Sequence, residues 1–129
     1  MEFEEIETNI LQKYKDSTLL KESGSYANSI YLSGYCVELS LKYAIARHLK
    51  WDKFYTEQKF KVLKVHDLDF LVSFTGQALE IKKMPAWQIV KEWDEQKRYK
   101  NPASSTEHDA NTMLIAVKTL VEFLCINLS

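Results

Sequence analysis

The fold of this chain is decided by residues 25–49, which read SYANSIYLSGYCVELSLKYAIARHL. Apolar residues fall on nearly every face of a helix drawn through this stretch, so we expect the helix to be central and covered by others. Ser25 belongs to the residue types that favour an N-cap, and Arg47 and His48 place cations near the C-terminus, where the helix dipole favours them.

Two further long helices are expected to pack against this one. Residues 3–22 carry apolar side chains mostly three to four positions apart, and their first turns are acidic, which suits the positive end of a helix dipole. Beyond a break at Pro102, residues 110–128 carry the cleanest heptad-like stripe of the chain. Ser104 and Glu107 have the spacing of a capping box, which predicts the start of the last helix.

Shorter helices are expected between the long ones. Asp67 can cap a helix that ends near Gly76, and Pro85 suits the first position of another that runs to about Trp93 or beyond. With 3 Gly and 2 Pro in 129 residues, the chain has little of the turn chemistry that sandwiches, barrels and phosphate-binding loops need. The sequence therefore predicts an all-α protein, an antiparallel bundle of four to five helices in a single domain spanning residues 1–129.

Composition and cysteine placement indicate a cytoplasmic protein. Apolar residues make up 46% and charged residues 27%, which excludes an intrinsically disordered chain. The N-terminal residues are acidic with no apolar signal core, and no apolar run approaches the roughly 20 residues of a membrane span. Because no such run is present, we expect no membrane partner. Cys36 and Cys125 lie far apart, each within an apolar helical pattern, so we expect buried, reduced thiols.

The net charge of −1 hides an uneven distribution. Residues 42–64 contain seven Lys or Arg against two acids, a balance of +5, whereas residues 1–22 contain six acids against three lysines, a balance of −3. One interpretation is a solvated loop with lysines matched to a helix dipole. The other is an edge that faces a polyanion, because aromatic residues interleaved with lysines suit base stacking and phosphate contact. The candidate nucleic-acid-binding residues are Lys50, Lys53, Lys59, Lys61 and Lys64.

A few polar side chains could carry chemistry. Glu38 and Lys42 stand four residues apart in the apolar central helix, so we expect Glu38 to be partly buried and paired. Its partner is either Lys42 or an Arg from elsewhere in the chain. Arg98 is one of two arginines against fifteen lysines, which favours a bidentate contact with Glu38 or a phosphate. His108 lies in the first turn of the last helix, where the dipole keeps a neutral imidazole suited to a general base, although a solvent-facing histidine without a role is the more common case.

The stretch His66-Asp67-Leu68-Asp69 has the composition of a metal-site fragment. No second His or third carboxylate follows at ligand spacing, and Asp67 is explained as a helix cap, so we expect no metal. The chain contains no phosphate-binding loop or dinucleotide fingerprint, and we expect no cofactor.

Three motifs follow one another along the chain. The segment from Tyr26 to Lys42 ends in Glu38-Leu39-Ser40-Leu41-Lys42, His66-Asp67-Leu68 is followed by Leu71, and Trp93 is followed by Arg98-Tyr99. In this order the motifs resemble the second helix, the entry to the third helix and the element before the last helix of HEPN domains, the higher eukaryotes and prokaryotes nucleotide-binding domains. The likeness covers about residues 10–128 and is closest to the bacterial members that accompany nucleotidyltransferases.

This resemblance implies a homodimer that binds RNA or a nucleotide in a toxin–antitoxin or defence setting, with a nucleotidyltransferase-type protein as a partner. Many members are metal-independent ribonucleases marked by Arg-x4–6-His, whereas here nine residues separate Arg98 from His108. In a ribonuclease of this type His108 would deprotonate a ribose hydroxyl, Arg98 would stabilise the phosphorane and Glu38 would position Arg98. The alternative is a non-catalytic dimeric interaction module. A third hypothesis is a nucleotide pocket lined by Tyr31, Tyr35 and Trp93.

Overall fold

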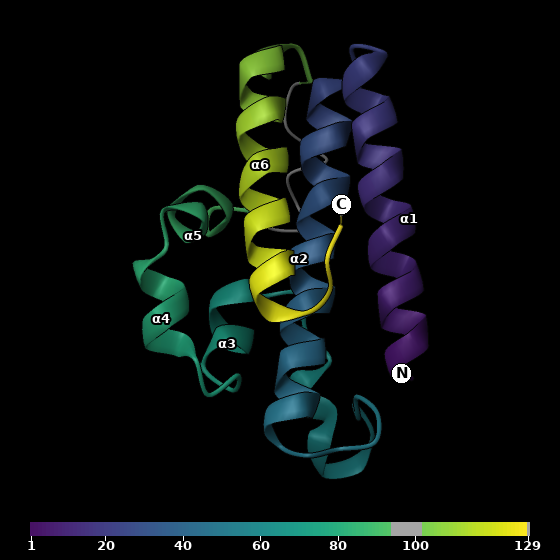
Figure 1. The fold of residues 1–129 in the computed structure, drawn as a ribbon, viewed down its shortest axis with the longest axis vertical. Coiled ribbons are helices and arrows are strands. Elements are labelled where there is room, and N and C mark those ends of the chain that lie inside the picture. The colour runs from purple at the N-terminus through teal and green to yellow at the C-terminus, as the bar shows by residue number, and fades with distance from the viewer. Residues whose placement is uncertain (94–101, 129) are drawn as a thin grey trace.

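Three long helices form the body of the protein (Figure 1). The structure is a computed structural model and describes residues 1–93 and 102–128. Helix α1 (Phe3–Glu22) turns back into α2 (Tyr26–His48), and α6 (Glu107–Leu124) lies along α2. Helix α1 is antiparallel to α2, whereas α6 runs in the same direction as α2. The described residues form no strand, which confirms an all-α helical bundle.

Helix α2 is the central element, as its sequence predicts. It packs against α1 on one side and α6 on another, and α3 covers it near its C-terminal half. Val37, Leu41 and Ile45 are completely buried. The hydroxyl groups of the buried serines of α2 donate to backbone carbonyls, as that of Ser40 does to the carbonyl of Cys36 (2.7 Å). The apolar pattern on nearly every face is therefore explained by neighbours on several sides.

The described residues between α2 and α6 contain short helices only. In chain order these are the 3-10 helix η1 (Gln58–Leu63), α3 (Leu68–Val72), α4 (Ala78–Lys83), α5 (Pro85–Val90) and the 3-10 helix η3 (Pro102–Ser104). Helix α5 packs against α6, so these short elements extend the core sideways from the three long helices.

The helix boundaries test the sequence predictions one by one. The carboxylate of Asp67 accepts a hydrogen bond from the backbone N–H of Phe70 (3.1 Å), which confirms the predicted cap of α3. Pro85 is the first residue of α5, as predicted, but that helix ends at Val90 instead of continuing to Trp93. Residues 91–93 lie outside the helix, and the N–H of Trp93 donates to the carbonyl of Val90 (2.9 Å).

The predicted capping box at the start of the last helix is wrong. Helix α6 begins at Glu107, and the cap is Thr106, whose hydroxyl accepts from the N–H of Asp109 (3.1 Å). Asp109 returns a bond, because its carboxylate accepts from the N–H of Thr106 (3.0 Å). Ser104 belongs to η3, so its backbone is already in a helical turn of its own and lies outside α6.

None of the described helices is long and apolar enough to cross a membrane.

Candidate functional site

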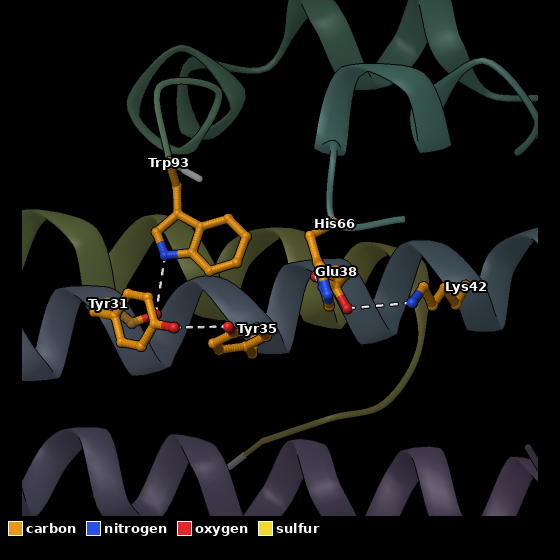
Figure 2. A network of polar contacts seen from close by, with 6 residues as sticks. All are labelled: Tyr31, Tyr35, Glu38, Lys42, His66 and Trp93. Atoms are coloured by element: carbon orange, nitrogen blue, oxygen red, sulfur yellow. Dashed lines mark hydrogen bonds and ion pairs between the residues drawn. The ribbon is translucent and has the colours of Figure 1, made fainter. Parts of the chain in front are cut away.

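A buried carboxylate, that of Glu38, lies in the middle of α2, with Lys42 on one side and His66 on the other (Figure 2). Glu38 is only 4% exposed, and its Oε2 lies 3.2 Å from Nζ of Lys42, which is itself 7% exposed. Its Oε1 lies 2.7 Å from Nδ1 of His66, which comes from the segment before α3. The predicted partner Lys42 is confirmed, and both carboxylate oxygens have a donor, as a buried charge requires.

His66 is the residue that sequence reasoning did not select. It stands immediately before the cap residue of α3, so the helix start fixes its backbone. Its side chain is 46% exposed, while the carboxylate it contacts is buried. A carboxylate beside Nδ1 favours the tautomer that carries a proton there. The sequence showed His66 in a stretch with the composition of a metal-site fragment and in a His-Asp-Leu motif, and neither pattern indicates a contact with Glu38.

An aromatic group lies one to two turns earlier on the same helix. The hydroxyls of Tyr31 and Tyr35 are 2.7 Å apart, and Nε1 of Trp93 donates to the carbonyl oxygen of Tyr31 (2.9 Å). The rings of Tyr35 and Trp93 are in edge contact, with centroids 4.9 Å apart. The three residues that the sequence suggested as a nucleotide pocket are therefore neighbours.

Trp93 is packed closely against the backbone of α2. The indole is 4% exposed and lies on Gly34, where a Cβ would come within 3.0 Å of three indole atoms. This close approach requires glycine at position 34. The indole therefore anchors the end of the α5 segment on α2.

The candidate catalytic residues are only partly placed by the structure. Arg98 lies outside the described residues, so its pairing with Glu38 or His108 stays a prediction. His108 is exposed in the first turn of α6. Helices α2 and α6 run in the same direction, and Cys125 at the end of α6 lines one groove together with Tyr43 of α2. This alignment places His108 beside the first turns of α2. Glu38 is therefore about three helical turns, roughly 16 Å, further along the bundle than His108. The structure does not bring Glu38 and His108 together.

The candidate nucleic-acid-binding lysines belong to the same stretch as a set of aromatic rings in edge contact, and we call this stretch the basic aromatic segment (residues 50–64). The ring of Trp51 contacts those of Tyr55 and Phe60, with centroids 5.4 and 4.7 Å apart. Nζ of Lys59 lies 5.3 Å from the Phe60 centroid, and Nζ of Lys53 lies 5.6 Å from that of Tyr55. Cations at such distances are attracted to the ring faces.

Two features connect the basic aromatic segment to the rest of the bundle. Phe54 is 1% exposed and belongs to the core, and its N–H donates to the carbonyl oxygen of Met1 (2.9 Å). Nζ of Lys53 lies 3.9 Å from a carboxylate oxygen of Glu2. The acidic start of α1 therefore lies beside the basic segment, and the opposite charges noted in the sequence meet at this end of the bundle.

The two cysteines are both free thiols. Cys36 is buried in α2 and Cys125 is half-buried at the end of α6. Burial raises the pKa of each thiol from 9.0 to about 12, so neither is a nucleophile near neutral pH. Within the described ranges no cluster of three or more His, Cys, Asp or Glu side chains could hold a metal ion.

Comparison with models of known protein families, with curated proteins and with solved structures gave no match to this chain.

Proposed function

We propose that this chain is a HEPN-like bacterial protein that binds RNA or a nucleotide, in a toxin–antitoxin or defence setting. The observation that carries the proposal is the basic aromatic segment. Its Lys50, Lys59, Lys61 and Lys64 are exposed, and no carboxylate of the described residues lies within 4.0 Å of them. Unpaired lysines beside half-buried rings suit a ligand that combines phosphates with planar bases.

The partly exposed rings of this segment offer a surface for bases. Trp51, Tyr55 and Phe60 contact one another and keep part of their surface open, and each base stacked on such a ring would contribute about 1–3 kcal/mol. Each phosphate that a lysine neutralises releases counterions and adds to affinity at low salt. Of these lysines, Lys53 lies close to a carboxylate, that of Glu2, which competes with a phosphate for its charge.

The arrangement around α2 supports the HEPN-like part of the proposal. Glu38 and Lys42 of the second-helix motif, His66 of the His-Asp-Leu motif and Trp93 of the third motif all contact α2 or belong to it. Segments that resemble the family in sequence thus converge on one face of the bundle. Cleavage of RNA, if it accompanies binding, would rest on Arg98 and His108, because the oxygens of Glu38 already face Lys42 and His66.

Binding is tested by fluorescence anisotropy with a labelled single-stranded RNA over a range of salt concentrations. We expect Lys59→Gln with Lys61→Gln to weaken binding and to reduce the slope of log K against log salt by about 0.7 for each phosphate that the variant no longer neutralises. The matched control is Lys82→Gln with Lys83→Gln, two exposed lysines on α4. Equal reductions in affinity for both pairs, or no RNA binding by the parent protein, would contradict the proposal.

Catalysis is tested on the same RNA in the presence of a chelator. A metal-independent ribonuclease would cleave under these conditions, and Arg98→Ala and His108→Ala would each abolish cleavage. Binding without cleavage identifies a non-catalytic member.

One observation favours the alternative of a dimeric, non-catalytic interaction module. An apolar groove of about 300 Å³ runs between α5 and α6, and it is flanked by Ile89, 41% exposed, and Ile115, 68% exposed. Exposed apolar surface beside a groove is typical of an interface with another chain. Light scattering during gel filtration tests this function, because Ile115→Lys would convert a dimer formed at this groove into a monomer.

A further inference from the structure

A second groove lies at the C-terminal ends of α2 and α6, where the turn between α3 and α4 meets them. Its volume is about 460 Å³. Arg47 and His48 of α2, and Gln77 before α4, contribute polar side chains, while Tyr43 and Phe123 contribute apolar surface. The groove is separate from the basic aromatic segment, because no residue of 50–64 lines it.

Three of the polar side chains that line this groove lack partners. Within the part of the chain that the structure describes, the guanidinium of Arg47, the ring of His48 and the side-chain amide of Gln77 make no hydrogen bond or ion pair. This contrasts with the middle of α2, where Glu38 and Lys42 satisfy each other. Two donors that can carry charge and one amide therefore face the same space with their hydrogen-bonding capacity unused.

Two of these side chains are nevertheless held in place. The guanidinium carbon of Arg47 lies 5.9 Å from the centroid of the Tyr43 ring, a cation–π contact. The ring of His48 lies against Gly76, where a Cβ would come within 3.0 Å of three imidazole atoms. Gly76 also has a φ of +75°, which favours glycine at this position. The turn thus supplies a surface on which the imidazole rests.

From this geometry we infer that the groove binds a small organic anion, a carboxylate or phosphate monoester attached to an apolar or aromatic group. The guanidinium of Arg47 would bind the anionic oxygens in bidentate fashion, and His48 and Gln77 would donate further hydrogen bonds. The apolar part of the ligand would lie on Phe123, whose side chain is 44% exposed. The inference does not depend on RNA binding, which uses other residues.

One carboxylate opposes such a ligand. The hydroxyl of Tyr43 donates to Oε1 of Glu7 (3.3 Å), which places a negative charge beside the groove. Its influence reaches the groove itself, because Glu7 raises the pKa of the Cys125 thiol there while Arg47 lowers it. An anion in the groove would be attracted by Arg47 and repelled by Glu7, which gives two substitutions with opposite expected effects.

Titration of the ¹⁵N-labelled full chain with benzoate, phenyl phosphate and benzamide tests the inference by NMR. At about 10 mM ligand, enough to saturate a site with a millimolar Kd, benzoate or phenyl phosphate should shift the amide signals of Gly76 and Gln77. Benzamide has the shape of benzoate without its charge and should not. Arg47→Gln should weaken binding about tenfold or more, and Glu7→Gln should strengthen it severalfold.

The matched control is Lys118→Gln, which removes a cation from a different groove, between α1 and α6. It should leave the shifts unchanged. Absence of shifts with both anions overturns the inference, as do equal shifts with benzamide or an undiminished response in Arg47→Gln. Because Arg47 is exposed, this variant should keep the dispersed spectrum of the folded protein, which shows that loss of binding is not loss of fold.

Discussion

Gly34→Ala tests the close packing of Trp93 on α2. In most helices this change stabilises a protein by about 0.5–1 kcal/mol, because glycine loses more conformational freedom on folding than alanine does. Here the added methyl group would come within 3.0 Å of three atoms of the Trp93 indole, which is 4% exposed. The backbone of α2 is held between α1 and α6, so the indole must move instead.

The cost of that movement follows from what the indole loses. Displacement breaks the hydrogen bond from Nε1 to the carbonyl of Tyr31 and the edge contact with the Tyr35 ring. Complete removal of a buried Trp side chain costs about 3–5 kcal/mol, and the helix propensity of alanine returns up to about 1 kcal/mol. We therefore expect Gly34→Ala to lower the free energy of unfolding by about 2–4 kcal/mol.

A double-mutant cycle with Trp93→Ala isolates the contact. Urea unfolding of the four proteins is followed by far-UV circular dichroism, because the substitution removes a fluorophore. In the Trp93→Ala background the clash is absent, so Gly34→Ala should stabilise the protein by about 0.5–1 kcal/mol, a reversal of sign. The reasoning is refuted if Gly34→Ala destabilises both backgrounds equally or stabilises the parent protein.

Three further outcomes are expected. Glu38→Leu should destabilise by about 3–5 kcal/mol, because it leaves the buried Lys42 unpaired, whereas the double variant with Lys42→Leu should lie much closer to the parent in urea unfolding. Thr106→Ala should cost about 1 kcal/mol in thermal unfolding, and Thr106→Ser, which keeps the cap, only a few tenths. The free energy of unfolding should fall as pH rises from 9.0 towards 12, because the thiols of Cys36 and Cys125 ionise more readily in the unfolded chain. The double variant Cys36→Ala with Cys125→Ala should show a smaller fall between the same pH values.

The long helices and the ion pair in α2 could be predicted because the information is local. The predicted range 3–22 coincides with α1, and the predicted range of about 25–49 differs from α2 by one residue at each end. Both contain continuous apolar patterns with few competing signals. Glu38 and Lys42 are one helical turn apart, so their contact follows from helix geometry once α2 forms.

The start of α6 could not be predicted because two capping signals overlap. Ser104 with Glu107 and Thr106 with Asp109 both have the spacing of a reciprocal cap. Local sequence does not distinguish them, and the structure shows the second pair in use, with Ser104 in η3. The choice between the two caps rests on tertiary packing, which a single sequence does not display.

Contacts between distant segments were equally inaccessible to sequence reasoning. Three contacts join residues that are 28 or more positions apart in the chain. His66 contacts Glu38, Trp93 packs on Gly34, and His48 packs on Gly76. Each pair becomes visible only when the short helices fold back over α2. The sequence thus indicated which residues could belong to the candidate site, but not which distant residues they contact.

The long stretch of chain between α2 and α6 has a consequence for how the protein folds. Helices α1 and α2 are joined by a short turn and form a hairpin from local contacts, whereas α6 must be brought alongside α2 by closing a loop that spans residues 49–106. Loop closure of this length is entropically unfavourable before the contacts form. We expect the hairpin to be structured in the folding transition state and α6 to dock later, so substitutions such as Val117→Ala would mainly accelerate unfolding.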